Sequence, residues 1–183
     1  MFGLEMPSLY TACKLMQALP NGLGGCVLSL DFVHGKASRD MVLKLGYPRW
    51  FPTCLGLFKL TQFAANWAAD GAYTPLAQCM MAFQLGGAAY THLVAEAKAD
   101  GKPGAIGGCV VFSVVTATAQ VYHGTLGLAA TVAVHALLAC LGYATGFVAS
   151  FLGSKDAPDS PLKLVKRLSS VRFGNIRGFA KTS

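Results

Sequence analysis

The sequence predicts an all-α protein, a bundle of membrane helices, and three observations of composition support that fold class. Charged residues make up 13% of the 183 residues, about half of the ~25% usual in soluble domains. Hydrophobic residues make up 54%, and the mean hydropathy is +0.48. The chain also has 21 glycines, which let helix backbones approach closely inside membranes.

Five apolar segments are predicted to cross a bilayer, since a membrane helix needs about 20 residues. They cover residues 9–33, 50–69, 75–94, 104–122 and 124–152. The last segment is the clearest, because it contains no formally charged residue, and a tight turn at His123-Gly124 is expected before it. Residues 1–152 therefore form the predicted transmembrane bundle.

Prolines predict the shape of two of these segments. Pro75 opens segment 75–94 at a position favoured in the first turn of a helix. Segment 9–33 contains Pro20-Asn21-Gly22 near its middle, so the sequence predicts a kinked or interrupted helix there.

Basic residues gather on one predicted side of the membrane. With five spans, residues 34–49, residues 95–103 and the chain from 153 onward share a side, and they hold every lysine and arginine except Lys14 and Lys59. Basic loops face the cytosol or its organellar equivalents, the matrix and the stroma. The net charge of +7 therefore indicates orientation and lipid contact rather than binding of nucleic acid.

Residues 153–183 are predicted to form a linker and a basic tail. Residues 153–161 are rich in turn-forming residues. The tail beyond them fits a short interfacial helix on anionic lipid headgroups, with a solvated tail as the alternative. The predicted lipid- or partner-binding residues are Lys163, Lys166, Arg167, Arg172 and Arg177.

Polar residues inside the spans predict a pocket. A lysine near the middle of a membrane helix costs roughly 2.5–3.5 kcal/mol on insertion scales, so Lys59 needs a partner. Gln62, Gln84 and the carbonyls freed near Pro20 are the candidates. Gln84 and His92 are eight residues apart and share a helix face, and together with Lys59 and Tyr90 they are expected to border a polar pocket. The alternative is that these groups only hold helices together.

The sequence gives fewer signals of catalysis or of cofactor binding. The sequence has no GxSxG, HExxH, Walker or post-strand GxGxxG motif, so no catalytic residues and no metal site are predicted. His135, and secondarily His92, are candidate ligands for haem iron or chlorophyll magnesium, with a simple interhelical hydrogen bond as the alternative. Lipid, chlorophyll and quinone are the candidate bound molecules.

A motif series at residues 10–122 resembles the DoxX-like family of small multi-spanning membrane proteins. The series comprises Leu45-Gly46-Tyr47-Pro48, then Lys59, then Gly87-Ala88-Ala89-Tyr90 with His92. The resemblance implies a four-helix core, to which segment 124–152 and the basic tail are additions. It also implies a link to quinone and sulfur chemistry, because the family name derives from quinone-linked thiosulfate oxidation.

Three functions are compatible with these features. The first is a non-catalytic accessory subunit of a large photosynthetic or respiratory membrane complex, docked on other membrane subunits through the added span and tail. The second is a quinone- or sulfur-linked membrane oxidoreductase component of DoxX type. The third is a pigment- or haem-binding subunit. The expected location is a thylakoid or inner mitochondrial membrane.

Overall fold

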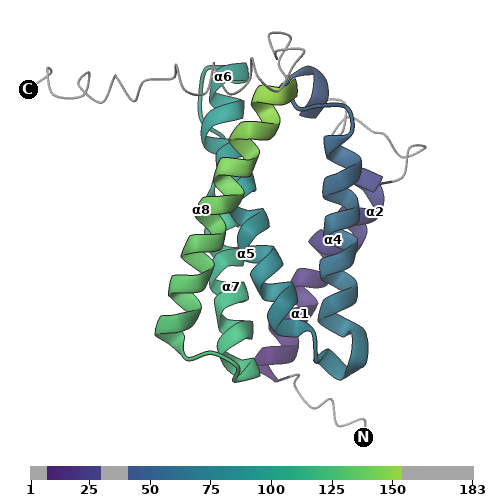
Figure 1. Ribbon diagram of the computed structural model, residues 1–183, viewed down its shortest axis with the longest axis vertical. Helices are drawn as coiled ribbons and strands as arrows, with labels where there is room; N and C mark the ends of the chain where they lie inside the picture. The colour runs from purple at the N-terminus through teal and green to yellow at the C-terminus, as the bar shows by residue number, and fades with distance from the viewer. Residues whose placement is uncertain (1–7, 30–40, 154–183) are drawn as a thin grey trace, which may run out of the picture.

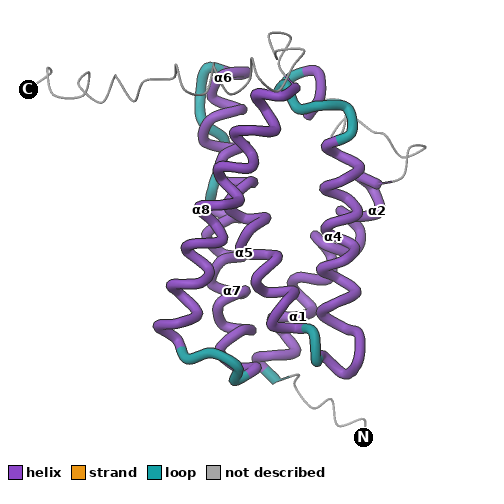
Figure 2. Tube along the Cα trace, in the orientation of Figure 1, coloured by secondary structure: helices purple, strands orange, loops and turns teal. Residues whose placement is uncertain are grey.

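The computed structural model describes residues 8–29 and 41–153, and all regular structure within these ranges is helical (Figure 2). The predicted all-α class is therefore confirmed. The predicted tail, including Lys163, Lys166, Arg167, Arg172 and Arg177, lies outside the described residues.

Segment 9–33 is helical over all its described residues. It consists of α1 (Leu9–Ala18), the π-turn η1 (Leu19–Leu23) and α2 (Gly24–Ser29). The Ser8 side chain caps α1 by accepting a hydrogen bond from the Thr11 backbone N–H, at 3.2 Å. Pro20 lies in η1, so the wider π-turn accommodates the proline without ending the helix.

The other helices follow the predicted segments with shifted ends, except α6, which lies in the predicted loop at residues 95–103. They are α4 (Phe51–Trp67), the 3₁₀ turn η3 (Ala68–Gly71), α5 (Thr74–Tyr90), the π-turn η4 (Thr91–Ala95), α6 (Glu96–Asp100), α7 (Gly107–His123) and α8 (Leu128–Gly153). Pro75 occupies the first turn of α5, as predicted. Gly124, with φ of 80°, caps α7, and α8 begins only at Leu128.

The described connections lie at two opposite ends of the bundle (Figure 1). At one end, Lys44 forms a salt bridge of 2.8 Å with Asp100 of α6, and Gly153 lies against the backbone of Gly46. At the other end, the Tyr10 hydroxyl donates to Thr74 at 3.1 Å. Residues 41–49, 96–103 and the end of α8 thus share one end, as the alternation of five segments predicts.

The last helix is an integral part of the bundle. A Cβ added at Gly86 of α5 would overlap the Ala139 carbonyl of α8, and one added at Gly142 would overlap the Phe83 carbonyl of α5. The two backbones therefore touch along α5, and this pairing is the most extensive helix contact in the described residues. The predicted fifth span thus packs its glycine face against α5 inside the chain.

The interior of the bundle, as far as the structure describes it, is rich in polar side chains and lacks the large aliphatic ones, which lie on its exterior. Among the described residues, the buried set includes Gln17, Gln62, Gln78 and Gln120 but no leucine, isoleucine, phenylalanine or tryptophan. Large apolar side chains are instead exposed on α1, α4, α7 and α8. Buried polar groups and broad apolar exposure are the informative deviations from the pattern of soluble proteins.

One described helix, Leu128–Gly153, is long and apolar enough by itself to cross a membrane. It has 26 residues, whereas α4 and α7 have 17 residues each, about 25 Å of helix. α5 continues without a break through η4 and α6 to Asp100. Two of the predicted spans, those of α4 and α7, are thus slightly shorter than the ~30 Å hydrocarbon core.

Candidate functional site

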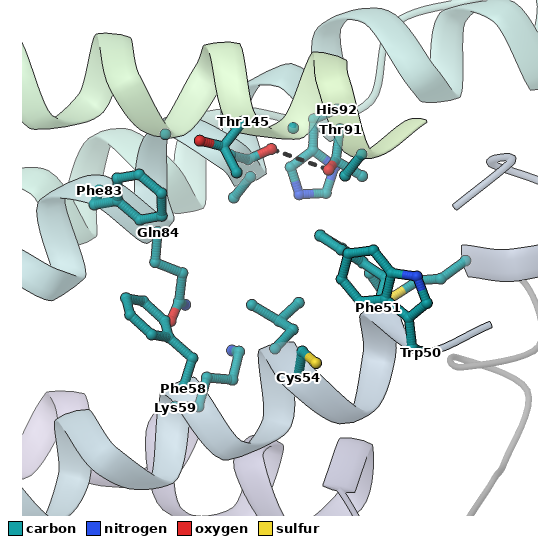
Figure 3. Close-up of a pocket in the computed structure, with 17 residues that line it drawn as sticks. Trp50, Phe51, Cys54, Phe58, Lys59, Phe83, Gln84, Thr91, His92 and Thr145 are labelled. Carbon is teal, nitrogen blue, oxygen red and sulfur yellow. Dashed lines mark hydrogen bonds between the residues drawn. The ribbon is translucent and has the colours of Figure 1, made fainter. Parts of the chain in front are cut away.

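A cavity of about 370 Å³ lies between α4 on one side and α5 with α8 on the other. Aromatic side chains and small residues form most of its wall, and three of the predicted pocket residues lie among them (Figure 3). Lys59, Gln84 and His92 all line this cavity, and we refer to it as the Lys59 cavity. The structure therefore brings together three side chains that are up to 33 positions apart in the sequence.

Lys59 is held at the cavity by a backbone carbonyl of the first helix. Its Nζ donates to the Pro20 carbonyl oxygen at 3.2 Å. The N–H of Gly24 bonds to the carbonyls of Leu19 and Asn21, the residues on either side of Pro20. Of the three predicted partners, a carbonyl near Pro20 is the one that Lys59 contacts, whereas Gln62 is buried elsewhere.

Gln84 reaches into the cavity from α5, opposite Lys59 on α4 (Figure 3). Its Oε1 is buried and has no hydrogen-bond partner in the described part of the chain. An unsatisfied buried amide oxygen costs about 1–3 kcal/mol, so this atom is suited to accept a hydrogen bond from a bound molecule.

His92 is oriented by an acidic residue one turn further along. Its Nδ1 lies 2.9 Å from Oε1 of Glu96, and the backbone N–H of Gly104 bonds to the His92 carbonyl at 2.7 Å. His92 lies in the π-turn η4, and such turns are frequent at functional sites. The contact with Glu96 uses one ring nitrogen and leaves Nε2 for another partner.

Tyr47, from the Leu-Gly-Tyr-Pro motif, contacts two residues that line the site, Phe51 and Thr91. It is 1% exposed, stacks on Phe51 with ring centroids 4.4 Å apart, and its hydroxyl lies 2.7 Å from Oγ1 of Thr91, which lines the cavity. Burial raises the pKa of Tyr47 above its ordinary value of 10.0. Gly46 has φ of 75°, a conformation that favours glycine and delivers Tyr47 to the interior.

Tyr90 does not line the Lys59 cavity. It is 2% exposed and packs edge-on against Tyr143, at 5.3 Å between ring centroids, and beside Gly146 of α8. Tyr90 follows Gln84 by six residues, so their side chains point about 120° apart around the helix axis. Tyr90 therefore faces away from the pocket in which it was predicted. His135 lies at a different cavity, among α5, α7 and α8.

A second polar cluster, which the sequence did not reveal, joins α1, α4 and α5. Oε1 of Gln17 accepts hydrogen bonds from Asn66 at 2.8 Å and from Gln78 at 3.1 Å, and Gln17 Nε2 donates to Gln78 at 2.8 Å. All three side chains are at most 2% exposed. Nearby, Lys14 is 7% exposed, with Nζ 4.7 Å from the centroid of the Trp67 ring.

Comparisons with known proteins add no assignment. No protein-family model matches the chain, and neither a curated protein nor a solved structure matches it. The resemblance to DoxX-like proteins therefore stays a prediction based on the motif series.

Proposed function

We propose that the chain is a multi-pass membrane protein of DoxX-like arrangement and that its Lys59 cavity binds an apolar ring molecule with a carbonyl oxygen, of the quinone class. The position of Lys59 is the observation that carries the proposal. Its ammonium group faces an apolar cavity from inside a helix, where a charge is expensive unless it is used.

The polar interior and apolar exterior support the membrane part of the proposal. A soluble bundle buries leucine and exposes glutamine, whereas the described residues show the opposite arrangement. In a bilayer, the exposed apolar side chains meet acyl chains, and the interior glutamines bond across helices. The 17-residue helices α4 and α7 suffice when loop residues at both ends complete the span.

The donors and walls of the cavity favour a quinone. An ammonium has three protons, and Pro20 takes one of those of Lys59, which leaves donors for a ligand carbonyl. Phe58, Phe83 and Trp50 line the cavity and provide aromatic faces for a ring. A small hydrophilic sulfur oxyanion would leave these walls without an apolar partner, so the quinone alternative fits the site better.

Fluorescence of Trp50 tests the proposal, because Trp50 lines the cavity and the chain has 2 tryptophans. In a Trp67→Phe background, decylubiquinone is expected to quench Trp50 in a saturable manner. Lys59→Met is expected to weaken binding roughly 10-fold or more, as a hydrogen bond from a charged group is worth about 1.5–3 kcal/mol. Lys98→Met, at an exposed lysine of α6, is the matched control. Linear, unsaturable quenching, or equal affinity in Lys59→Met, would refute the proposal.

An accessory subunit of a photosynthetic or respiratory complex is the second candidate. Exposed Val110, Val111 and Val114 make an apolar face on α7, and Gly107 and Gly108 have open space where a side chain would be. That face is available to a neighbouring membrane subunit in a thylakoid or inner mitochondrial membrane. Migration of the mildly solubilised protein as a lone small species on a native gel would eliminate this candidate.

A further inference from the structure

A second cavity, of about 290 Å³, lies among α5, α7 and α8 and is distinct from the Lys59 cavity. Small residues such as Ala117, Ala136 and Ala139 form much of its wall, and Thr116 and His135 contribute polar groups. No residue lines both cavities, so an inference about this one does not depend on the proposed quinone site.

Two residues that line this cavity each have a buried polar atom without a hydrogen bond in the described part of the chain. These atoms are Nε2 of His135 and Oγ1 of Thr116, and Thr116 is 0% exposed. A helical threonine ordinarily satisfies its hydroxyl on the preceding turn, as Thr61 does with the Leu57 carbonyl at 3.0 Å. Two orphaned groups at one cavity indicate that something else satisfies them.

The size and the walls of the cavity restrict which molecule can satisfy these two atoms. A water molecule takes up about 30 Å³ of liquid, so the cavity has room for roughly ten. Apart from His135, Thr116 and Ser113, the lining side chains are apolar, and the Ser113 hydroxyl already donates to the Cys109 carbonyl at 2.8 Å. Ten waters would therefore lack partners, and cavities with such walls stay dry or take apolar molecules.

We propose that this cavity binds an amphipathic alcohol, with a compact apolar body and a single hydroxyl that bonds to His135 and Thr116. A hydroxyl both donates and accepts, so it satisfies the imidazole nitrogen in either tautomer and the threonine as well. A metal ion at the centre of a haem or chlorophyll would engage His135 alone and would leave Thr116 unpaired. The alcohol accounts for both orphaned atoms.

The ligand has a route into the cavity from the outside of the bundle. Val114 of α7 and Val132 of α8 line the cavity and are 63% and 55% exposed. The opening therefore lies on the apolar face, where an alcohol dissolved in the bilayer arrives sideways with its apolar body already out of water.

Photo-crosslinking of the intact, detergent-solubilised protein tests this inference. The probe is a diazirine derivative of geraniol, and its control is the same diazirine hydrocarbon without the hydroxyl. The alcohol is expected to label peptides of α7 and α8 about tenfold more strongly, the factor that one or two hydrogen bonds supply. His135→Phe and the isosteric Thr116→Val are each expected to reduce this preference, and Thr61→Val on α4 is the matched control.

Three results would overturn the inference. Equal labelling by the alcohol and the hydrocarbon would show that the cavity takes any apolar chain. A preference unchanged in Thr116→Val and His135→Phe would place the alcohol elsewhere. A visible tetrapyrrole absorption band in the purified protein, lost in His135→Phe but kept in Thr116→Val, would assign the cavity to a pigment or haem. Thr116→Val keeps the shape of the side chain nearly unchanged, so it remains informative if His135→Phe fails to fold.

Discussion

The cluster of Gln17, Asn66 and Gln78 gives a quantitative test of the polar interior. Replacing Gln78 with leucine removes its hydrogen bonds to Gln17, at 2.8 and 3.1 Å, and its bond to Asn66 Oδ1, at 3.0 Å. Gln17 Nε2 and Asn66 Oδ1 then lose the partners they have in the cluster. An orphaned buried group costs about 1–3 kcal/mol, whereas hydrogen bonds between membrane helices average about 0.6 kcal/mol. We therefore expect Gln78→Leu to lower the free energy of unfolding by about 1–3 kcal/mol.

A triple variant, with leucine at positions 17, 66 and 78, distinguishes the cost of an orphaned polar group from the cost of the lost contacts. It leaves no orphaned partner, so it is expected to cost less than Gln78→Leu alone, within about 1 kcal/mol of the unchanged chain. Gln62→Leu is the matched control, because Gln62 is 0% exposed and its amide atoms have no partner in the described residues. It is expected to be neutral or stabilising. Thermal and denaturant unfolding in detergent, followed by tryptophan fluorescence, measures all of these. Equal losses in Gln62→Leu and Gln78→Leu, or a triple variant as costly as the sum of its single changes, would refute the reasoning.

Three further predictions use the same unfolding assay. Ala69→Gly is expected to stabilise by about 1 kcal/mol, since Ala69 has φ of 47°, and a loss of stability would contradict that conformation. Gly142→Ala is expected to lower the free energy of unfolding by about 1–3 kcal/mol, because the added methyl group would overlap a carbonyl of α5. Gly127→Ala is the control and is expected to have little effect, because the space around Gly127 is open. Similar losses in both variants would argue against the close contact of α5 with α8. Burial raises the pKa of Tyr47 above 10.0, so its contribution to stability is full below pH 10 and declines as the pH rises through the folded-state pKa. Tyr47→Phe should flatten that alkaline decline, and an identical decline would exclude Tyr47 as its cause.

Helices and their starts are predictable from local sequence in this chain. Apolar runs locate the described helices, Pro75 marks the first turn of α5, and the series around Pro20 predicts the irregular turn. The contact of Lys59 with a carbonyl near Pro20 is also predictable, because a lysine in a membrane helix needs an acceptor and the helix is irregular at this proline. Each of these inferences depends on neighbours in the sequence or on a single obligatory pairing.

Contacts between distant helices are not predictable in this way. The amides of Gln17, Asn66 and Gln78 are 12 to 61 positions apart, and nothing local shows that their helix faces meet. The misplacement of Tyr90 has the same origin, since sequence position near the end of a span does not fix which neighbour a side chain faces. Similarly, segment 124–152 looks like an addition by sequence, yet its glycines pair with α5 only in three dimensions.

Cysteine accessibility in sealed membrane vesicles tests the central claim, a bundle that crosses the bilayer with its apolar faces in lipid. Cys26 of α2 and Cys140 of α8 are exposed in the described structure. If the bundle crosses the bilayer, both cysteines are protected from a charged maleimide until the vesicles are dissolved in denaturing detergent. Lys102→Cys and Asp70→Cys, at opposite ends of the bundle, should react from opposite sides of the membrane. Labelling of Cys26 and Cys140 in intact vesicles as fast as after denaturation, or of Lys102→Cys and Asp70→Cys from the same side, would contradict the claim.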